Sequence, residues 1–416
     1  MSYGKRTAWD IGIVGAGPAG LAAAIFAAGQ GKSVLLLDHL VRPGAKLLAT
    51  GGGRCNITNA AEVSAMCASF GPAARFVRPA VTSFPPSALL SFFSGLGVEC
   101  EATDGFHYFP TSGSAKEILN ALLAACDTAG VDIRPGARVV AFETAGGRVS
   151  ALRTTENRFP VASAIVASGG KGWPKLGSDG SGYTLAASVG ATIVPPLPAL
   201  GALFCNDAWV RSLSGVSLAD AAVTVTPPEG KPVRTRGELL FTHNGLSANA
   251  ALDASGRIAG LLRSSPTVPV SVDFLPAIPR DQLDATIVAA SGVSGSRLVR
   301  SELARVLPAS LANALSTLAG VYNTQLASLT VTARKALVAR VKESPINVTG
   351  TDGFEKAMVT TGGVSRDEVS PKTLAFSKLP GLHFAGEVLD VDGPCGGYNL
   401  QWAFSSGRLA GLSAGT

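Results

Sequence analysis

Charged side chains are scarce in this chain. Asp, Glu, Lys and Arg make up 15% of its 416 residues, whereas hydrophobic residues make up 46%. A composition of this kind supports a large buried core and excludes an intrinsically disordered protein. Aromatic residues reach only 6% and are not interleaved with the arginines, so the stacking surface typical of single-strand nucleic-acid binders is not indicated. The length predicts two or three domains.

Cysteine chemistry is limited too. The six cysteines form no C-x-x-C pair and no Cys/His group at zinc spacing, so we expect no metal site and no thioredoxin-like redox pair. No secretory signal is visible, and a reducing cytoplasmic location is the expectation. The longest uncharged stretch, Ile11–Ala28, is interrupted by glycines and by Pro18. It predicts strand, turn and helix rather than insertion in a membrane.

Glycine, by contrast, is abundant, and it dominates a motif typical of dinucleotide binding: Gly15, Ala16, Gly17, Pro18, Ala19 and Gly20. The first glycine permits a tight turn, the second lets the backbone approach a pyrophosphate, and the third lets helix and strand pack closely. The motif follows an apolar strand and opens a helix, whose N-terminal amides favour anions. Asp38 and His39 end a second buried strand, where an acid can accept hydrogen bonds from the adenosine ribose.

A second glycine-rich segment begins near Lys46 and contains Gly51, Gly52, Gly53, Arg54, Cys55 and Asn56. A flexible backbone that carries polar side chains suits a planar ligand that has to be wrapped. Arg54 is a candidate to hold an anion, either a phosphate or a reduced flavin. Cys55 is either a redox thiol or a small buried hydrophobe.

Other strand ends carry small or acidic residues. The strand-like run 138–142 contains Val139, and a later strand ends at Ala167, Ser168 and Gly169, close to Lys171. Near the C-terminus a strand ends at Gly386 and Glu387, and a glycine pair opens the last helix with Gly397, Tyr398, Asn399 and Leu400. Because glycine has no Cβ, this glycine pair predicts a backbone that lies directly against a flat ring. The amides of the helix start would then stabilise charge on a reduced flavin.

The middle third has a different character. Strand-like segments at 221–226 and 238–242 precede a helical stretch from about 279 to 342, with helix N-caps predicted at Ser294 and Thr330. We interpret this third as an insertion, a small β unit followed by a helical unit. Basic residues outnumber acidic ones between Arg280 and Glu343. They form either solvated helix faces or a surface for an anionic partner.

Several of these motifs together resemble one family. The phosphate turn, Lys46–Asn59, Leu240–Ser247, Thr361–Val364, Ala385–Asp392 and the Gly-Gly-Tyr-Asn block occur in the order found in the BaiN/YhiN-type bacterial flavoproteins. These are described as NAD(P)/FAD-dependent oxidoreductases or aminoacetone-oxidase-family FAD-binding enzymes. The resemblance implies FAD and an inserted barrel-plus-helical domain. Asp38 departs from the usual Glu, and Asn249 departs from a common proline. One branch of the family looks like reductases of unsaturated 3-oxo bile acids.

The predicted fold is therefore an α/β FAD/NAD(P)-binding Rossmann-like doubly wound sheet, interrupted by a β-barrel and a helical domain. We expect residues 1–195 and 350–416 to form the discontinuous FAD-binding domain. The barrel is expected at 196–275 plus about 343–350, and the helical subdomain at 276–342.

The predicted function is an oxidoreductase in which non-covalent FAD exchanges hydride with a small-molecule substrate at the interface with the insertion. NAD(P)H, oxygen or a carrier would be the second redox partner. A second G-x-G-x-x-G between strand and helix is absent, which argues against the disulfide-reductase class. Candidate catalytic residues are His243, Arg54, Lys171 and Tyr398. Nucleic acid is not the expected partner, although an RNA-modifying flavoprotein and a flavin-binding scaffold without turnover stay open, as does the oligomeric state.

Overall fold

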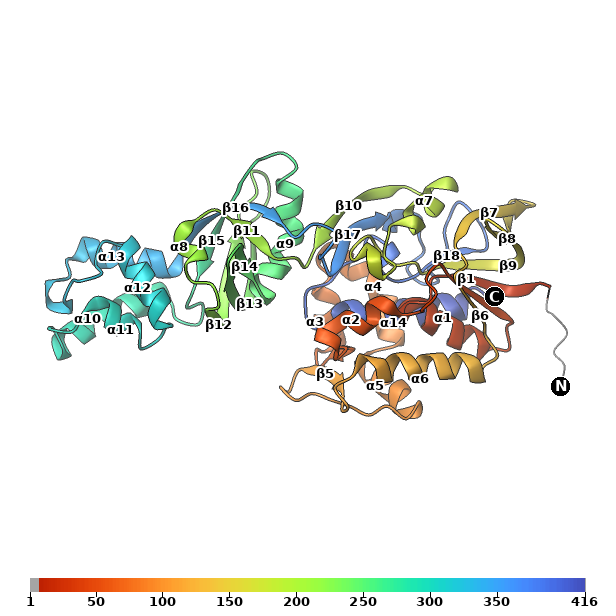
Figure 1. Ribbon diagram of the computed structural model, residues 1–416, viewed down its shortest axis with the longest axis horizontal. Helices are drawn as coiled ribbons and strands as arrows, with labels where there is room; N and C mark the ends of the chain where they lie inside the picture. Colours follow the sequence, from red (N-terminus) through yellow and green to blue (C-terminus); the bar gives the residue numbers. More distant parts are fainter. Residues whose placement is uncertain (1–6, 416) are drawn as a thin grey trace. The chain divides into compact units, whose positions relative to one another are not determined.

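The computed structural model describes residues 7–415, and the chain divides into two compact units (Figure 1). Unit 1 combines Met1–Leu197 with Val359–Thr416, and unit 2 is Pro198–Met358. The chain therefore leaves unit 1 once, builds unit 2, and returns. Where the barrel ends and a separate helical subdomain begins stays a prediction.

Unit 1 is built on a seven-stranded sheet. Strands β6, β2, β1, β9, β8 and β7 follow one another across it, and β18 pairs with β9. Their bounds are Asp132–Pro135, Val34–Asp38, Trp9–Val14, Arg158–Val166, Arg148–Thr154, Val139–Ala145 and Leu382–Phe384. The pairs of β1 with β2 and β9, of β2 with β6 and of β9 with β18 are parallel, whereas β7, β8 and β9 pair antiparallel. The central strands are almost wholly apolar because both of their faces are buried.

Helices cover this sheet, and the closest contact joins the two ends of the chain. A Cβ at Gly407 would lie 2.2 Å from the carbonyl oxygen of Ala19, and one at Gly411 would lie 2.4 Å from that of Ala23. The last helix can approach the first only because these positions are glycine. The helices of unit 1 are α1 Pro18–Ala28, α2 Ala45–Ala49, α3 Val63–Ala68, α4 Ala74–Ser83, α5 Pro86–Gly95, α6 Ala115–Thr128, α7 Ser181–Ser188 and α14 Tyr398–Ser413.

Two small sheets complete unit 1. Strands β3 (Thr58–Asn59), β5 (His107–Pro110) and β4 (Cys100–Glu101) form one of them. Strands β10 (Ile193–Ala199) and β17 (Val359–Val364) form the other, next to the two points where the chain leaves and returns.

Unit 2 contains a closed barrel of six strands in the order β11, β14, β13, β12, β15, β16. Their bounds are Leu203–Cys205, Gly245–Ser247, Val233–Thr242, Ser217–Val225, Val268–Asp273 and Ser344–Thr351. The helices are α8 Ala208–Arg211, α9 Asn249–Leu261, α10 Arg280–Val293, α11 Val299–Leu303, α12 Ala309–Leu318 and α13 Val331–Lys342. One apolar core runs through barrel and helices. A buried ion pair between Lys342 Nζ and Asp273 Oδ1 (2.8 Å) joins α13 to the end of β15.

The fold class is confirmed: a Rossmann-type sheet is interrupted by a closed barrel with helices. Thr330 is confirmed as an N-cap, since its Oγ1 accepts the amide of Ala333 at 3.2 Å. Ser294 is wrong as an N-cap, because it ends α10 and the next helix begins only at Val299, after Leu298. Helix α9 lies in a stretch for which only strands and turns were expected. Within the described residues no helix has the length and apolar character needed to cross a bilayer.

Candidate functional site

The turn between β1 and α1 is shaped by its three glycines. A Cβ at Gly15 would lie 2.6 Å from the carbonyl oxygen of Ala167, and one at Gly20 would lie 1.8 Å from that of Gly15. Gly15 also has a φ of 102°, in the left-handed region. At Gly17, by contrast, a Cβ would meet nothing within 4 Å. The first and third glycines are required by protein packing, and the second borders open space.

That open space lies at an uncapped helix start. Helix α1 has Gly17 as its N-cap residue, no side-chain capping hydrogen bond and no acidic residue in its first turn. Pro18, in the first turn, adds no amide donor, and the following amides carry the positive end of the helix dipole. An anion is the group that such a helix start accepts. The turn therefore fits the pyrophosphate of a dinucleotide.

Asp38 lies at the end of β2, beside this turn. Its Oδ2 accepts the amide of Ala16 at 2.6 Å, and its Oδ1 accepts the amide of Leu40 at 2.7 Å. A carboxylate has about four acceptor positions, so two remain for ribose hydroxyls. His39 bridges two acids, with Nδ1 4.0 Å from Asp38 and Nε2 3.9 Å from Asp179.

Asp179 is itself held as an anion. Burial alone would raise its pKa, but hydrogen bonds from Ser181 and Arg138 outweigh that effect and bring the pKa to about 2. Arg138 Nη1 lies 2.8 Å from Asp179 Oδ2. The next residue, Val139, is buried at the start of β7. These residues line the same side of the unit as Asp38 and His39.

The second glycine-rich segment joins the C-terminal part of the site through an ion pair. Lys46 Nζ, in α2, lies 2.9 Å from Glu387 Oε2, which follows β18. Gly52 and Gly53 are exposed and left-handed, with φ of 66° and 89°. Arg54 is exposed as well, and its guanidinium lies 4.5 Å from the centre of the Phe109 ring.

Cys55 is a buried thiol rather than a reactive one. Burial raises its pKa to about 12, and the hydrogen bond with Thr50 offsets only part of that rise. A thiol with such a pKa carries almost no thiolate at neutral pH, and the thiolate is the reactive form. Of the two alternatives for Cys55, this environment favours the small buried hydrophobe.

The segment that follows β9 contains a buried hydroxyl group for which the described residues offer no hydrogen-bond partner. Ser168 Oγ is buried and has no hydrogen-bond partner in the part of the chain that the structure describes. A Cβ at Gly182 would lie only 1.9 Å from this oxygen. A buried hydroxyl without a partner is unusual and marks a place where a ligand can complete the bonding. The next residues are tied down, because the amide of Lys171 donates to Thr360 Oγ1 at 2.8 Å.

The segment that follows β18 contacts both α14 and the start of α1. Gly386 donates its amide to Ser406 Oγ at 2.9 Å, and a Cβ on it would lie 2.9 Å from Cβ of Ala19. Glu387 Oε1 accepts the amide of Thr360 at 2.9 Å, in addition to the Lys46 pair. The phosphate turn and the segment after β18 are therefore in direct contact.

Gly396 and Gly397, before α14, are required by protein packing and not by the flat ring that was expected. A Cβ at Gly397 would lie 2.6 Å from the carbonyl carbon of Thr58, and one at Gly396 would lie 2.9 Å from Nε2 of His107. The missing side chains thus make room for β3 and β5, and the expectation of a flat ring in their place is wrong. Asn56 completes this contact, since in the orientation that satisfies its amide the oxygen accepts the Gly397 amide at 3.2 Å.

The start of α14 nevertheless keeps the properties of an anion-stabilising end. It has no side-chain cap and no acidic residue in its first turn. The Asn399 side chain bonds to Gly393 and Pro394 in the preceding loop. Tyr398 packs edge-on against Phe70, with ring centres 6.3 Å apart. Leu400 belongs to the same first turn.

An acidic loop lies between Glu387 and the glycine pair. Burial raises the pKa of Asp392 to about 6, the Thr361 hydrogen bond lowers it in part, and the carboxylates of Asp390 and Glu387 raise it further. Asp390 is paired with Arg366 at 3.2 Å. A buried carboxyl group with such a pKa exchanges its proton near neutral pH.

All residues expected to bind the cofactor lie in unit 1, as do the candidate catalytic residues Arg54, Lys171 and Tyr398; their contact with FAD stays a prediction. His243 lies elsewhere, in the exposed hairpin between β13 and β14 of unit 2, with Nδ1 3.1 Å from Ser214 Oγ. Its role toward a flavin stays a prediction. Thr360 and Ser406, which hold these segments together, were not singled out from the sequence. Thr360 had a local signal, as the neighbour of the Thr361–Val364 motif.

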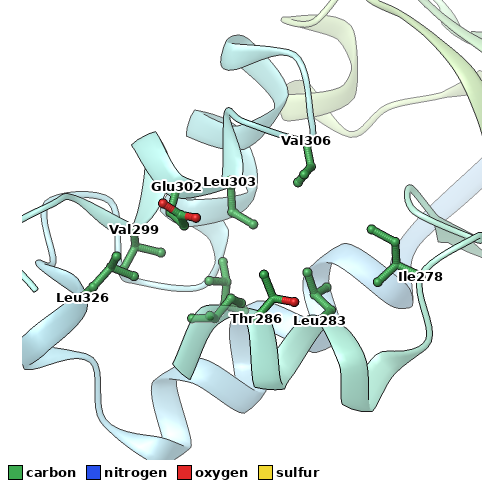
Figure 2. Close-up of a pocket in the computed structure, with 10 residues that line it drawn as sticks. Ile278, Leu283, Thr286, Val299, Glu302, Leu303, Val306 and Leu326 are labelled. Carbon is green, nitrogen blue, oxygen red and sulfur yellow. The ribbon is translucent and has the colours of Figure 1, made fainter. Parts of the chain in front are cut away.

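Unit 2 contains a small pocket among its helices (Figure 2). It has about 50 Å³ of free space and lies among α10, α11 and α13, lined mainly by apolar side chains such as Leu283, Leu303 and Leu337. Glu302 at its edge is held by Arg297. Pockets for small-molecule cofactors measure roughly 300–1,000 Å³. The cavity is a packing defect of the helices and is far too small for a dinucleotide. Across residues 7–415, no group of three or more His, Cys, Asp or Glu side chains is placed to hold a metal.

Comparison with known families gives one match over nearly the whole chain. The model of the HI0933-like protein Rossmann domain matches residues 9–413. A 3-dehydro-bile acid delta(4,6)-reductase of Clostridium scindens is 36% identical over 408 residues, which cover 97% of this chain and 98% of the relative. A ribosomal RNA dihydrouridine synthase of Haemophilus influenzae is 32% identical over 406 residues, with 96% and 97% covered. That of Escherichia coli is 30% identical over 400 residues, with 96% of each chain covered.

Solved structures share the fold. A 3-ketosteroid-delta4-(5alpha)-dehydrogenase from Rhodococcus jostii RHA1 superimposes with a TM-score of 0.54 at 17% identity, covering 100% of this chain and 98% of the other. A flavocytochrome c3 fumarate reductase gives a TM-score of 0.53 at 18% identity, with 99% and 79% covered. At these identities the likeness concerns the fold alone.

Proposed function

We propose, on the premise that this chain belongs to the HI0933-like Rossmann-domain family and is an FAD-dependent oxidoreductase, that it reduces a carbon–carbon double bond conjugated with a carbonyl group in a small organic substrate. NADH or NADPH would reduce the flavin by transient binding. When bound, FAD supplies the chemistry of hydride transfer, and the protein supplies binding, orientation and electrostatics.

The observation that carries this proposal is the uncapped start of α1. Gly17 borders open space, and its neighbours in the turn contact the other segments: a Cβ at Gly15 would lie 2.8 Å from Cα of Ser168, and one at Gly386 would lie 2.9 Å from Cβ of Ala19. The pyrophosphate would lie against the α1 amides, with the ribose at Asp38. The ribityl chain and flavin would follow Lys46, Glu387 and the start of α14, whose amides stabilise negative charge.

The choice of substrate class is supported by the chemistry that the names of the relatives share. A 3-dehydro bile acid with double bonds at positions 4 and 6 has alkenes conjugated with a ketone. A uridine that becomes dihydrouridine loses the double bond conjugated with its ring carbonyl. Both reactions add a hydride and a proton across an electron-poor alkene. Arg54, Lys171 and Tyr398 are the proposed contacts on the substrate side.

The test begins with the cofactor. Purified yellow protein, once denatured, is expected to release FAD and not FMN. Anaerobic NADH or NADPH should bleach the flavin, and a 3-oxo-4,6-diene bile acid should restore its colour while losing one of its two carbon–carbon double bonds. Release of FMN would contradict the dinucleotide site. A flavin that resists NADH, NADPH and dithionite alike would favour a scaffold without turnover.

A second candidate substrate is a uracil ring within RNA, and one feature of unit 2 favours it. Between Arg280 and Glu343 the chain has eight Lys or Arg residues against four Asp or Glu, an excess of four out of the six in the whole chain. Five of the eight are ion-paired; Arg300, Lys335 and Arg340 have no ion pair within the described residues. Arg300 also lies 4.0 Å from the centre of the exposed Tyr322 ring.

Binding to a ribosomal RNA transcript separates the two candidates. If RNA is the substrate, wild-type affinity should fall steeply with salt, and Lys335→Glu with Arg340→Glu should weaken it further. The exposed Lys231→Glu serves as a control outside the helical stretch. Reduction of the bile acid probe, together with RNA binding that neither salt nor the helix substitutions change, would reject the RNA candidate.

A further inference from the structure

The turn before β5 holds a histidine by one ring nitrogen. Nδ1 of His107 lies 2.5 Å from Oδ2 of Asp104. The other carboxylate oxygen, Oδ1, accepts the amides of Phe106 at 2.9 Å and of His107 at 2.7 Å. The His107 side-chain bond, followed by these backbone bonds, holds the pKa of Asp104 below its usual range. The carboxylate thus fixes both the turn and the orientation of the imidazole.

The second ring nitrogen faces the start of α14. Nε2 of His107 lies 2.9 Å from the position that a Cβ of Gly396 would occupy, so only glycine leaves room for the ring. Asn59, which pairs with His107 across β3 and β5, donates its Nδ2 to the Gly396 carbonyl at 2.7 Å. The His107 side chain is 28% exposed, which gives it access to water.

We infer that His107 is the proton donor of the reaction and that Asp104 is the residue that positions it, an inference that rests on the proposed function. An imidazole whose Nδ1 proton is held by a carboxylate presents Nε2 for proton transfer. Asp104 and His107 lie on one turn of unit 1 and Gly396 on a distant segment, and Gly396 adjoins the helix start that we assign to the flavin. Arg54 comes from the same region, over Phe109 of β5.

The proton balance is simple. Reduction breaks the π bond of the alkene, and the carbon remote from the carbonyl receives a hydride from the reductant. The carbon next to the carbonyl receives a proton from Nε2 of the imidazolium. Neutral imidazole remains, with its Nδ1 proton kept on the ring and donated in a hydrogen bond to Asp104, and water restores the Nε2 proton through the exposed edge of the ring.

The alternative is a purely structural turn, and a spectroscopic experiment that needs no substrate separates the two. The chain has four histidines, so ¹⁵N-histidine labelling of the holoenzyme gives few signals, and His107→Gln assigns the one of interest. Dithionite reduction under argon should shift the Nε2 resonance of His107, because charge changes in the space that this nitrogen faces. Flavin-free Gly17→Val protein should show no shift. An unmoved His107 resonance in the holoenzyme would overturn the inference.

Kinetics supply the second readout. In His107→Gln we expect the flavin content and the rate of flavin reduction by NAD(P)H to stay at wild-type values. Reoxidation by the 3-oxo-4,6-diene bile acid or by cyclohex-2-enone should slow by about a hundredfold or more, the usual contribution of a positioned acid. Added imidazole should restore part of the rate in His107→Ala, where the ring has left space beside Gly396.

Asp104→Asn tests the positioning role separately. Asn keeps an oxygen for the amides of Phe106 and His107, so the turn survives, but it removes the carboxylate from Nδ1. Reoxidation should slow while FAD content and the melting temperature stay unchanged. Wild-type reoxidation rates in both His107→Gln and Asp104→Asn would reject the inference. Should the wild type reduce neither probe, the proposed function fails, and the resonance experiment still decides the place of His107.

Discussion

Nζ of Lys46 lies 2.9 Å from Oε2 of Glu387, although 341 positions separate the two residues in the chain. The pair is about four-fifths buried, with side-chain exposures of 22% and 21%. It fastens the segment after the phosphate turn to the segment that follows β18. Partly buried pairs of this kind contribute more to stability than exposed ones, because solvent screens them less.

The ion pair predicts a measurable coupling. Lys46→Met and Glu387→Gln should each destabilise unit 1, and the double variant should recover about 1 kcal/mol relative to the sum of the single effects. Urea unfolding of the four proteins measures this cycle. The exposed Arg236–Asp220 pair of unit 2 is the matched control and should show weaker coupling. Additive effects of the Lys46 and Glu387 substitutions would contradict the prediction.

Gly17→Val is expected to yield folded protein without flavin. The residue has a φ of −81°, which valine tolerates, and its missing Cβ borders open space. Loss of colour with an unchanged circular dichroism spectrum and melting behaviour of the flavin-free form would locate the phosphate there. Gly95→Val, at another glycine with nothing within 4 Å, should keep its flavin. Full flavin content in Gly17→Val would refute the assignment.

Asp392 predicts a pH dependence of stability. Burial raises its pKa to about 6 in the folded chain, against roughly 3.9 in an unfolded one. The folded state therefore binds more protons between these values, and stability falls as pH rises from about 4 to 6. Asp392→Asn should flatten this window and stabilise the flavin-free protein at pH 7 by roughly 3 kcal/mol. Denaturant titrations at pH 4.5 and 7 provide the measurement; an unchanged pH slope would count against it.

Cys55 should behave as an inert side chain. Because burial raises the pKa of its thiol to about 12, iodoacetamide at pH 8 should leave it unmodified in native protein and modify it after denaturation. Peptide mass spectrometry distinguishes the two. Cys55→Ser should keep both FAD and turnover. Rapid labelling of native Cys55, or loss of turnover in a Cys55→Ser protein that keeps its full FAD content, would support a redox role for Cys55.

Local patterns predicted the parts of the fold that local physics determines. The turn Gly15–Gly20 was recognisable because each glycine has its own steric reason, and a strand was expected just before Gly386, where β18 (Leu382–Phe384) is found. Helix α9 escaped because it begins directly after a short strand and Ala248, with no capping side chain. Serine is a residue type common at N-caps, but Ser294 is the residue that ends α10, and the next helix begins only after Leu298.

Local sequence patterns could not predict contacts between segments that are far apart in the chain. Thr58 Oγ1 donates to Gln401 Oε1 at 2.6 Å across 343 positions, and no local feature of either residue announces this bond. The same holds for Gly397, which was expected to face a ring and instead faces the backbone of Thr58. Asp104 and His107 are close in sequence, but their relation to Gly396 depends on the pairing of β3 with β5.

The close packing of α1 with α14 has a consequence for how the protein is made. A ribosome delivers Ala19 and Ala23 before unit 2 and Gly407 and Gly411 after it, so the whole of unit 2 emerges between the two pairs. During that interval α1 lacks its contact with α14, and the phosphate turn lacks its contact with Gly386 and the segment that follows β18. Unit 2 needs no residue outside 198–358 to close its barrel. The insertion can therefore fold on the nascent chain, whereas the dinucleotide site is assembled only after unit 2 has been synthesised.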